Sequence, residues 1–375
     1  MNGSLAVNAW QTPVLSRPVE RVLCILVVAA AIKMPLGIPL YLNGVLLAVG
    51  LFAFVVIQAL PKLFLWVIAL LALGAVAAVQ GDILSDSGPR LAQVVLMVGA
   101  SALVARLDPA MFARYLAILP FLMILVGTVE SLLPEPLYER PISPGVFAPR
   151  HGGLAGEPNY TAMLYGVIGL ILAQHPPRVL GVLPFFLAIP ALSRGLLAAL
   201  AAWLGAHALG RSLARLAPLL VALLCLQPLI MLWFDAAIDG ALRDELNRLS
   251  SQRYLIWVAH AEAGASTPLG VGYFQGQVVA TQFADLPAHH AARQAHSIFL
   301  QVWGEFGWLG YLLFVGFLLH VTRIVARLAP AQLPLLIFIL AGYAFINGLS
   351  DWAFWVGIGY VLAQARRAPP WAAAG

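Results

Sequence analysis

Long apolar segments follow one another along almost the whole chain, and this feature limits the possible folds more than any other. A helix needs about 20 predominantly apolar residues to cross the hydrocarbon core of a bilayer. Prolines interrupt several of the segments, so their number is fixed only at roughly twelve. The segments lie at about 20–38, 43–60, 62–80, 90–106, 111–133, 158–174, 178–190, 192–209, 214–234, 297–321, 331–349 and 352–364.

Composition excludes a soluble fold. Of the 375 residues, 62% are hydrophobic and 10% are charged, whereas soluble domains are roughly half apolar and a quarter charged. No soluble core could bury so much apolar surface. The sequence therefore predicts an all-α, polytopic transmembrane helical bundle of about twelve spans, with residues 1–375 as a single integral membrane domain.

Basic residues predict how this bundle is oriented. With the amino terminus in the cytoplasm, most Lys and Arg fall in cytoplasmic connections, and the short outer connections hold only Lys33, Arg90 and Arg194. Two long segments, about 134–157 and 235–296, then lie outside. We expect these two segments, the second of them partly helical, to cover a site on the outer face.

The second outer segment begins with an amphipathic pattern. Asp239 or Gly240 could open a helix there, and Gly264 would end it. Such a helix would lie on the outer leaflet or over a cavity. Neither the single cysteines Cys24 and Cys225 nor the other residues of the chain form a pattern with metal-ligand spacing, so we predict neither a disulfide nor a metal site.

His296 stands at the start of an apolar segment, near the predicted membrane surface. A histidine there can be neutral at pH 7 and accept a proton from a hydroxyl; the alternative is a boundary histidine bonded to a loop carbonyl. Ser297, Gln301 and Glu305 follow at four-residue spacing and share a helix face. A charge this deep costs about 2.5–3.5 kcal/mol, so Glu305 would need a partner, be protonated or anchor a neighbouring helix.

Arg194 lies in a short break between two apolar segments, where targeting does not require a basic residue. Guanidinium groups bind phosphate oxygens in pairs, and a diphosphate at the membrane surface would need several of them. Arg150, Arg253 and Arg293 could converge with Arg194. Contact with lipid headgroups would explain any one of these arginines, but it explains the group less well.

Glu157 and Asn159 place a carboxylate and an amide at the start of another span. Helix capping is the simpler explanation for Glu157, because Pro158 suits a first helical turn.

Four sequence elements occur in order between about 150 and 310: GLAGEPNYTAML, LSRGLLAAL, QRYLIW followed by TPLGVGYF, and AHSIFLQVWGEFGWLG. Together they resemble the O-antigen ligase and O-antigen polymerase superfamily of bacterial inner-membrane glycosyltransferases. They are similar to its glycine-rich element before a span, its Ser-Arg-Gly helix start, its arginine-to-tryptophan helix with a Pro-Leu-Gly-x-Gly turn, and its His-Asn-x-x-Leu helix. Ser297 departs from the last motif, which usually has asparagine there. The short chain and Glu157-Pro158 are closer to the polymerases, but ligase and polymerase stay open.

The resemblance implies a metal-independent, inverting glycosyl transfer without a cofactor, at the periplasmic face of the bacterial inner membrane. The donor would be a glycan on undecaprenyl diphosphate. The acceptor would be a sugar hydroxyl, on lipid A-core for a ligase or on another lipid-linked repeat unit for a polymerase. Carried onto this chain, Arg194, Arg253 and Arg293 would hold the leaving diphosphate, and His296 would orient or deprotonate the acceptor hydroxyl. Arg150 would also bind the diphosphate, and supporting roles would fall to Glu157, Asn159, Trp257 and Glu305.

A membrane transporter or flippase of lipid-linked or small substrates is the alternative. Such proteins place polar residues near the midplane on broken helices, and many have two similar halves. Here the halves do not match, and the polar residues gather at the predicted outer surface.

Overall fold

The computed structural model describes residues 15–32, 65–80, 84–132, 158–189, 193–250, 253–283 and 295–367. Every regular element within these ranges is a helix, as the apolar pattern predicts. In chain order the helices are α2 (Arg17–Ala29), α4 (Leu65–Gln80), α5 (Leu84–Val104), α6 (Pro109–Leu116), α7 (Leu119–Leu132), α8 (Pro158–Leu172), α9 (Val179–Ala188), α10 (Arg194–Leu209), η4 (Gly210–Ser212), α11 (Leu213–Cys225), α12 (Gln227–Ala237), α13 (Gly240–Leu249), α14 (Arg253–Ser266), α15 (Gly276–Phe283), α17 (Ile298–Leu328), η5 (Pro330–Gln332), α18 (Leu333–Tyr343) and α19 (Trp352–Arg367).

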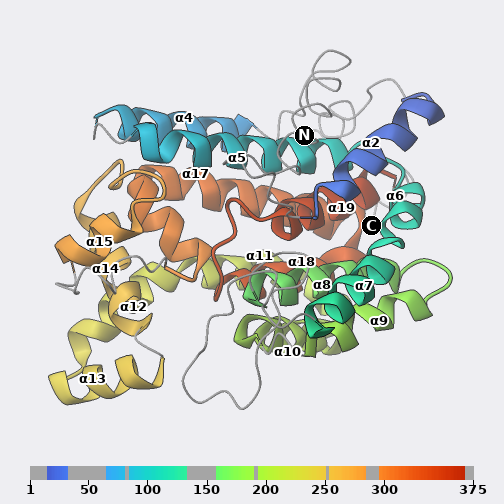
Figure 1. Ribbon diagram of the computed structural model, residues 1–375. Coiled ribbons are helices and arrows are strands. Elements are labelled where there is room, and N and C mark those ends of the chain that lie inside the picture. Colours follow the sequence, from blue (N-terminus) through green and yellow to red (C-terminus); the bar gives the residue numbers. More distant parts are fainter. Residues whose placement is uncertain are drawn as a thin grey trace.

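The helices are stacked in layers (Figure 1). In that view α4 and α5 cover α17 and α19, and α18, α8 and α10 lie below them. The buried core runs through α8, α17, α18 and α19, whose inward faces are almost continuously apolar. The helices α12 to α15 gather at one end of the bundle, and α2 and α6 at the other.

Three helical segments in the described ranges are long and apolar enough to cross a membrane: Pro109–Val129, Arg194–Cys225 and Ile298–Leu328. The second contains the turn at Gly210, with φ 53°, so it consists of the two helices α10 and α11. Shorter apolar helices accompany them. These helices support a membrane protein; the count of about twelve spans stays a prediction, and the expected span 43–60 lies outside the described residues.

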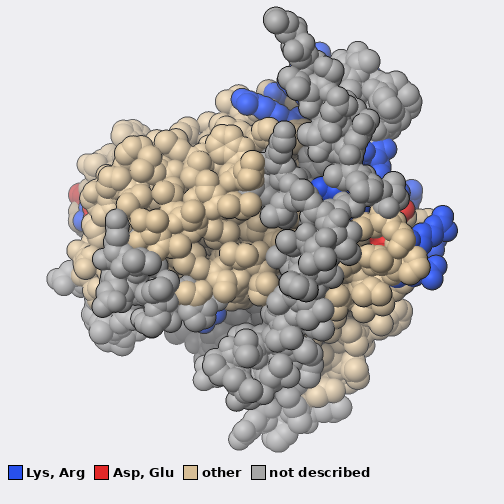
Figure 2. Space-filling model, turned by 90° about the horizontal axis from the view of Figure 1, so that it is seen from above, with Lys and Arg blue, Asp and Glu red and all other residues tan. Residues whose placement is uncertain are grey.

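Charged side chains tie the helix ends together at the end of the bundle that holds α2 and α6. Arg367 Nη1 lies 2.7 Å from Asp108 Oδ2, and Arg366 Nη1 donates to the carbonyl of Arg106 at 3.1 Å. The buried carboxylate of Glu20 accepts from the backbone N–H of Asp108. Figure 2 shows Lys and Arg side chains gathering toward this side, beside a broad face that carries no charged side chains in view. The structure thus brings together arginines that the sequence assigns to the cytoplasm.

The end of α12 and the two helices that follow it are joined through Asp235 on α12. Its Oδ2 lies 2.5 Å from Arg243 Nη2 on α13, and its Oδ1 accepts from Tyr254 OH on α14 at 3.0 Å. Burial, together with the Asp235 carboxylate, raises the pKa of Tyr254 to about 12. These contacts fix the start of α14, where Arg253 lies.

The expected single amphipathic helix is wrong in its extent. Asp239 does open a helix, since its carboxylate accepts from the N–H of Leu242 at 2.8 Å. That helix, α13, ends at Leu249, and α14 then runs past Gly264 to Ser266. Gly264 lies inside α14, at a position where any side chain would collide with Trp303 of α17. The glycine allows close helix packing and does not end the helix.

The long helix α17 is interrupted at Gly307, whose backbone has φ 65° and ψ −177°. A break of this kind leaves carbonyls without their usual partners four residues on. The carbonyl of Gly304 instead accepts from the N–H of Val271 at 3.2 Å, and the carbonyl of Glu305 accepts from the N–H of Gly272 at 3.0 Å. The turn at residues 267–272 therefore supplies donors that the helix has lost.

The same turn also accepts a bond from the other side of the break. The N–H of Leu309 donates to the carbonyl of Pro268 at 3.2 Å. Gly270, with φ 74°, packs against the backbone of residues 305–307, so a side chain at either Gly270 or Gly307 would collide with backbone atoms. The Pro-Leu-Gly-x-Gly turn and the segment Glu305-Phe306-Gly307 of α17 are thus two halves of one interlock.

Gly307→Ala is expected to destabilise the protein more than Gly210→Ala. Both glycines have positive φ, and holding an alanine in that conformation costs about 1–3 kcal/mol. Only at Gly307 does the added methyl also collide with the Pro268 carbonyl, whereas at Gly210 it meets nothing within 4 Å. The collision adds about 1–3 kcal/mol. Melting temperatures of the two purified variants in detergent measure the difference, and equal losses would contradict the interlock.

Candidate active site at the helix starts

His296 lies immediately before α17, half-buried, with φ 49°. The helix is capped by Ser297, whose hydroxyl accepts from the N–H of Leu300 at 3.3 Å, so His296 precedes the helix, which begins at Ile298, one residue after the expected start of the span at about 297. Left-handed backbone is uncommon for residues with a side chain and is found mostly at functional sites and turns. The histidine is therefore held in a defined bend ahead of the helix.

Three other helices and turns fix the backbone on both sides of this histidine. Trp257 Nε1 of α14 donates to the carbonyl of Ala295 at 2.7 Å. The N–H of Ser297 donates to Asn347 Oδ1 at 3.2 Å. The Ser297 hydroxyl also donates to Gln227 Oε1 at the start of α12, at 2.9 Å. The residue that departs from the family motif thus makes both a helix cap and a contact between helices.

Arg253 is placed beside this bend by α14. It lies four residues before Trp257, so the two side chains share a helix face, and that face contacts the carbonyl of Ala295. Arg253 is half-buried at the first position of α14. Trp257 therefore links the start of α14 to the bend at His296, and the convergence of Arg253 with His296 on one substrate stays a prediction.

Arg194 reaches this end through α10. A Cβ built on its neighbour Gly195 would lie 2.8 Å from Ile346 Cδ1 and 3.1 Å from the carbonyl of Gly342. The start of α10 thus packs on the end of α18, next to Asn347, which binds the residue after His296. Arg194 itself is exposed at the first position of α10. Its link to His296 within the described residues runs through these neighbours.

Asn159 lies at the same end, at the start of α8, where it is buried. A side chain at Gly342 would collide with Met163, which is one helical turn after Asn159. The other predicted site residues, Arg150, Glu157 and Arg293, lie outside the described residues. Their place in the site stays a prediction.

Glu305 is buried and has partners. Its Oε2 accepts from the backbone N–H of Phe274 at 3.0 Å and from Gln301 Nε2 at 3.2 Å. The shared face of Gln301 and Glu305 is thereby confirmed. Of the alternatives left open by the sequence, the structure shows partners for Glu305, and its bond to Phe274 also holds the segment that follows the turn at 267–272.

Arg90 is a cation near this region that we did not select from the sequence as a site residue. Its guanidinium carbon lies 4.5 Å from the ring centroid of Phe274, whose backbone has φ 65°. A guanidinium over an aromatic face is attracted by the ring quadrupole. The sequence gave one indication that Arg90 could belong to a site: it is one of only three basic residues on the predicted short outer connections.

His260 of α14 is fully buried, and neither ring nitrogen has a hydrogen-bond partner among the described residues. A Cβ built on Gly304 would lie 2.7 Å from its Nδ1, so the ring fills the contact between α14 and α17. Burial lowers the pKa of His260 to about 3. This histidine is therefore neutral at physiological pH and has a packing role.

Over the described ranges, no group of three or more His, Cys, Asp or Glu side chains gathers. Metal independence stays a prediction of the sequence.

Residues 179–315 match the family model described as O-antigen ligase. The matched segment runs from α9 into α17 and contains Arg194, Arg253 and His296. The chain therefore carries an O-antigen ligase family segment, and the resemblance drawn from the sequence motifs is confirmed. No curated protein matches the chain.

His260→Leu is expected to flatten the acid dependence of stability. The folded ring stays neutral down to about pH 3, whereas an unfolded histidine takes up a proton near pH 6.5. Between these values the unfolded state binds more protons, so wild-type stability falls as pH drops, by up to about 1.4 kcal/mol per pH unit. Leucine fills a similar volume and cannot take up the proton.

Melting temperatures from pH 7 to pH 4 test this prediction. His207→Gln changes an exposed histidine of α10 and serves as the control. A His260→Leu variant that loses stability with acid as steeply as wild type would show that His260 is not the source of the slope.

Proposed function

We propose that the chain is a glycosyltransferase of the O-antigen ligase or polymerase type. It transfers a glycan from undecaprenyl diphosphate to a sugar hydroxyl at the periplasmic face of the bacterial inner membrane. The observation that carries this proposal is that the family match over residues 179–315 contains the histidine and two arginines, and that these three residues lie at one end of the bundle.

In the proposed reaction, the acceptor hydroxyl oxygen attacks the anomeric carbon from the side opposite the diphosphate. The carbon–oxygen bond to the diphosphate breaks, and its electron pair leaves with undecaprenyl diphosphate. A single displacement of this kind inverts the anomeric configuration. His296 orients the acceptor hydroxyl or accepts its proton. No metal or cofactor takes part.

Arginines stabilise the leaving group in this proposal. Arg194, Arg253 and Arg293 would neutralise the diphosphate, because guanidinium groups bind phosphate oxygens in pairs and stay charged at any physiological pH. Positive groups placed where negative charge develops are among the strongest contributors to catalysis. Arg194 and Arg253 each lie at a helix start, where the helix dipole also favours an anion. Arg150 is retained as a further diphosphate-binding residue and Glu157 as a supporting residue.

A transporter or flippase remains the alternative. The break in α17 at Gly307 is a feature that many transporters use to bind ions or substrates. Here the turn at residues 267–272 occupies the break and bonds the carbonyls of Gly304 and Glu305. Backbone groups that are already paired are poor ligands for an ion or substrate, so the break at Gly307 has a structural role. This favours the transferase over the transporter.

His296→Ala and Arg253→Ala are expected to abolish complementation of a strain that lacks the gene. Loss of a catalytic acid–base group lowers rates by about 10²–10⁴-fold. Arg253→Lys keeps the charge but loses paired binding of phosphate oxygens, so it should restore only part of the activity. Arg211→Ala, at an exposed position between α10 and α11, is the matched control.

Gel banding of lipopolysaccharide gives the measurement. Missing surface polymer with long chains still on the lipid carrier identifies a ligase, and a single repeat unit left on the acceptor identifies a polymerase. Full rescue by both alanine variants would contradict the site, and an unchanged polymer after deletion would contradict the function.

A further inference from the structure

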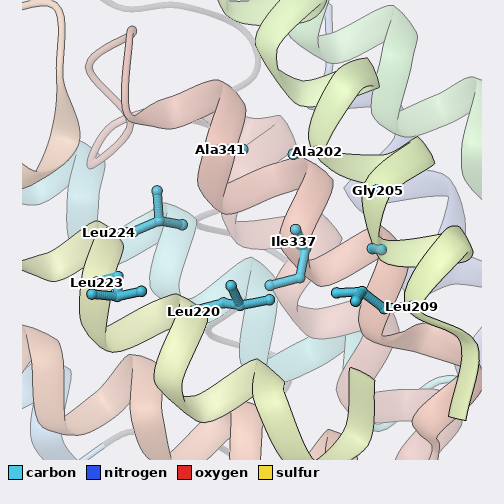
Figure 3. Close-up of a pocket in the computed structure, with 9 residues that line it drawn as sticks. Ala202, Gly205, Leu209, Leu220, Leu223, Leu224, Ile337 and Ala341 are labelled. Carbon is cyan, nitrogen blue, oxygen red and sulfur yellow. The ribbon is translucent and has the colours of Figure 1, made fainter. Parts of the chain in front are cut away.

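Two of the grooves that the described residues form differ in whether a charged side chain lines them. The groove between α10, α11 and α18 is about 580 Å³ in volume and is lined only by apolar residues (Figure 3). Such walls do not select one occupant over another. The groove between α2, α6 and α7 is about 320 Å³ in volume and is lined by Arg114, Tyr115 and apolar residues. A charge in an apolar wall needs water or a counter-ion, so this second groove selects for an anion.

One face of α2 forms the first wall of this groove. Ile25, Val28, Ala29 and Ile32 line it, at the three- and four-residue spacing of a single helix face. Arg21 precedes Ile25 by four residues, so it stands on the same face, one turn nearer to the start of the helix. Its side chain is exposed.

The second wall comes from α6 and the start of α7. Arg114, Ile118 and Leu122 line the groove at four-residue spacing, so they too share a helix face. The arginine again comes first and the apolar residues follow. The carboxylate of Glu20 accepts from the N–H of Asp108, which places the starts of α2 and α6 side by side. Both arginines therefore stand at the same end of the groove.

The acidic side chains at this end are already engaged. Asp108 pairs with Arg367 and also caps α6, and Glu20 binds the backbone N–H of Asp108. Among the described residues, neither Arg21 nor Arg114 has an ion pair or a side-chain hydrogen bond, and both are exposed. Two uncompensated cations thus stand at one end of an apolar groove.

We propose that this groove binds an anionic phospholipid, with an acyl chain between the two apolar faces and the phosphate at Arg21 and Arg114. Guanidinium groups bind phosphate oxygens in pairs, and basic pockets between membrane helices on the cytoplasmic side bind anionic lipid headgroups. The sequence assigns this end of the bundle to that side. A free anion would use the cations and leave the apolar walls without a partner, whereas a phospholipid uses both.

This lipid site lies at the opposite end of the bundle from the helices that hold the bend at His296 (Figure 1). It goes beyond the proposed transfer reaction and does not depend on it. Transfer activity and lipid binding are separate measurements, so either can fail while the other holds.

Exposed positions allow variants that leave the core intact. Arg114→Gln removes the charge from the groove, and Arg178→Gln is its matched control, because Arg178 is an exposed arginine just before α9 that does not line the groove. Ile118→Ala removes contact with the acyl chain at a residue that is 56% exposed. Its control is Ile124→Ala on α7, at a residue that is 40% exposed and lies outside the groove.

The test is native mass spectrometry of the purified, delipidated full-length chain, titrated with phosphatidylglycerol or with phosphatidylcholine that has identical acyl chains. We expect phosphatidylglycerol to bind about fivefold more tightly. Arg114→Gln should weaken its binding about fivefold, as expected for the loss of one cation beside a phosphate, and Arg21→Gln should do the same. Ile118→Ala should weaken both lipids about fivefold through lost apolar contact, and both controls should bind as wild type does.

Four outcomes would overturn the lipid site. Equal affinity for the two lipids, or equal weakening by Arg178→Gln, would show that no specific cation selects the headgroup. Displacement of phosphatidylglycerol by inorganic phosphate at the same concentration would show a site for a free anion. Dimers in the same spectra that Ile118→Ala dissociates, with lipid binding unchanged, would show that the groove binds a second copy of the chain.

Discussion

The interlock between the turn at residues 267–272 and the break in α17 is the contact on which the rest of the site depends. Unpaired backbone groups are costly wherever water is excluded, so a helix broken at Gly307 needs donors and acceptors from elsewhere. The turn supplies both, through Val271, Gly272 and Pro268. Because α14 leads directly into this turn, the interlock fixes the position of α14 along α17. It thereby also fixes the contact of Trp257 with the bend at His296.

Charged side chains at both ends of the bundle follow the same physical rule. Polar side chains are stable only where water or a partner reaches them. At one end Glu20, Asp108 and Arg367 satisfy one another and the helix ends. At the other, Arg194 lies exposed at a helix start. The first arrangement stabilises structure, and the second leaves positive charge available for a ligand.

Local patterns in the sequence were enough to predict part of this site. The four-residue spacing of Gln301 and Glu305 gave the helix face that they share, and Asp239 caps a helix as its residue type suggests. The prediction that Gly264 ends a helix was wrong, because glycine can either end a helix or permit close packing. Which of the two applies here depends on Trp303, a residue far away in the chain. Gln227 and Asn347, which bind Ser297, carry no local indication of that contact.

The sequence by itself determined that the chain is helical and apolar enough for a membrane, since composition and helix periodicity need no knowledge of distant contacts. The order of its motifs determined the O-antigen ligase family segment. Only the tertiary structure decided that His296 lies in a left-handed bend, that Arg194 and Arg253 reach the same end as this histidine, and that Glu305 anchors a turn. These features depend on which helix ends meet, and hydrogen bonds between residues distant in sequence set that choice.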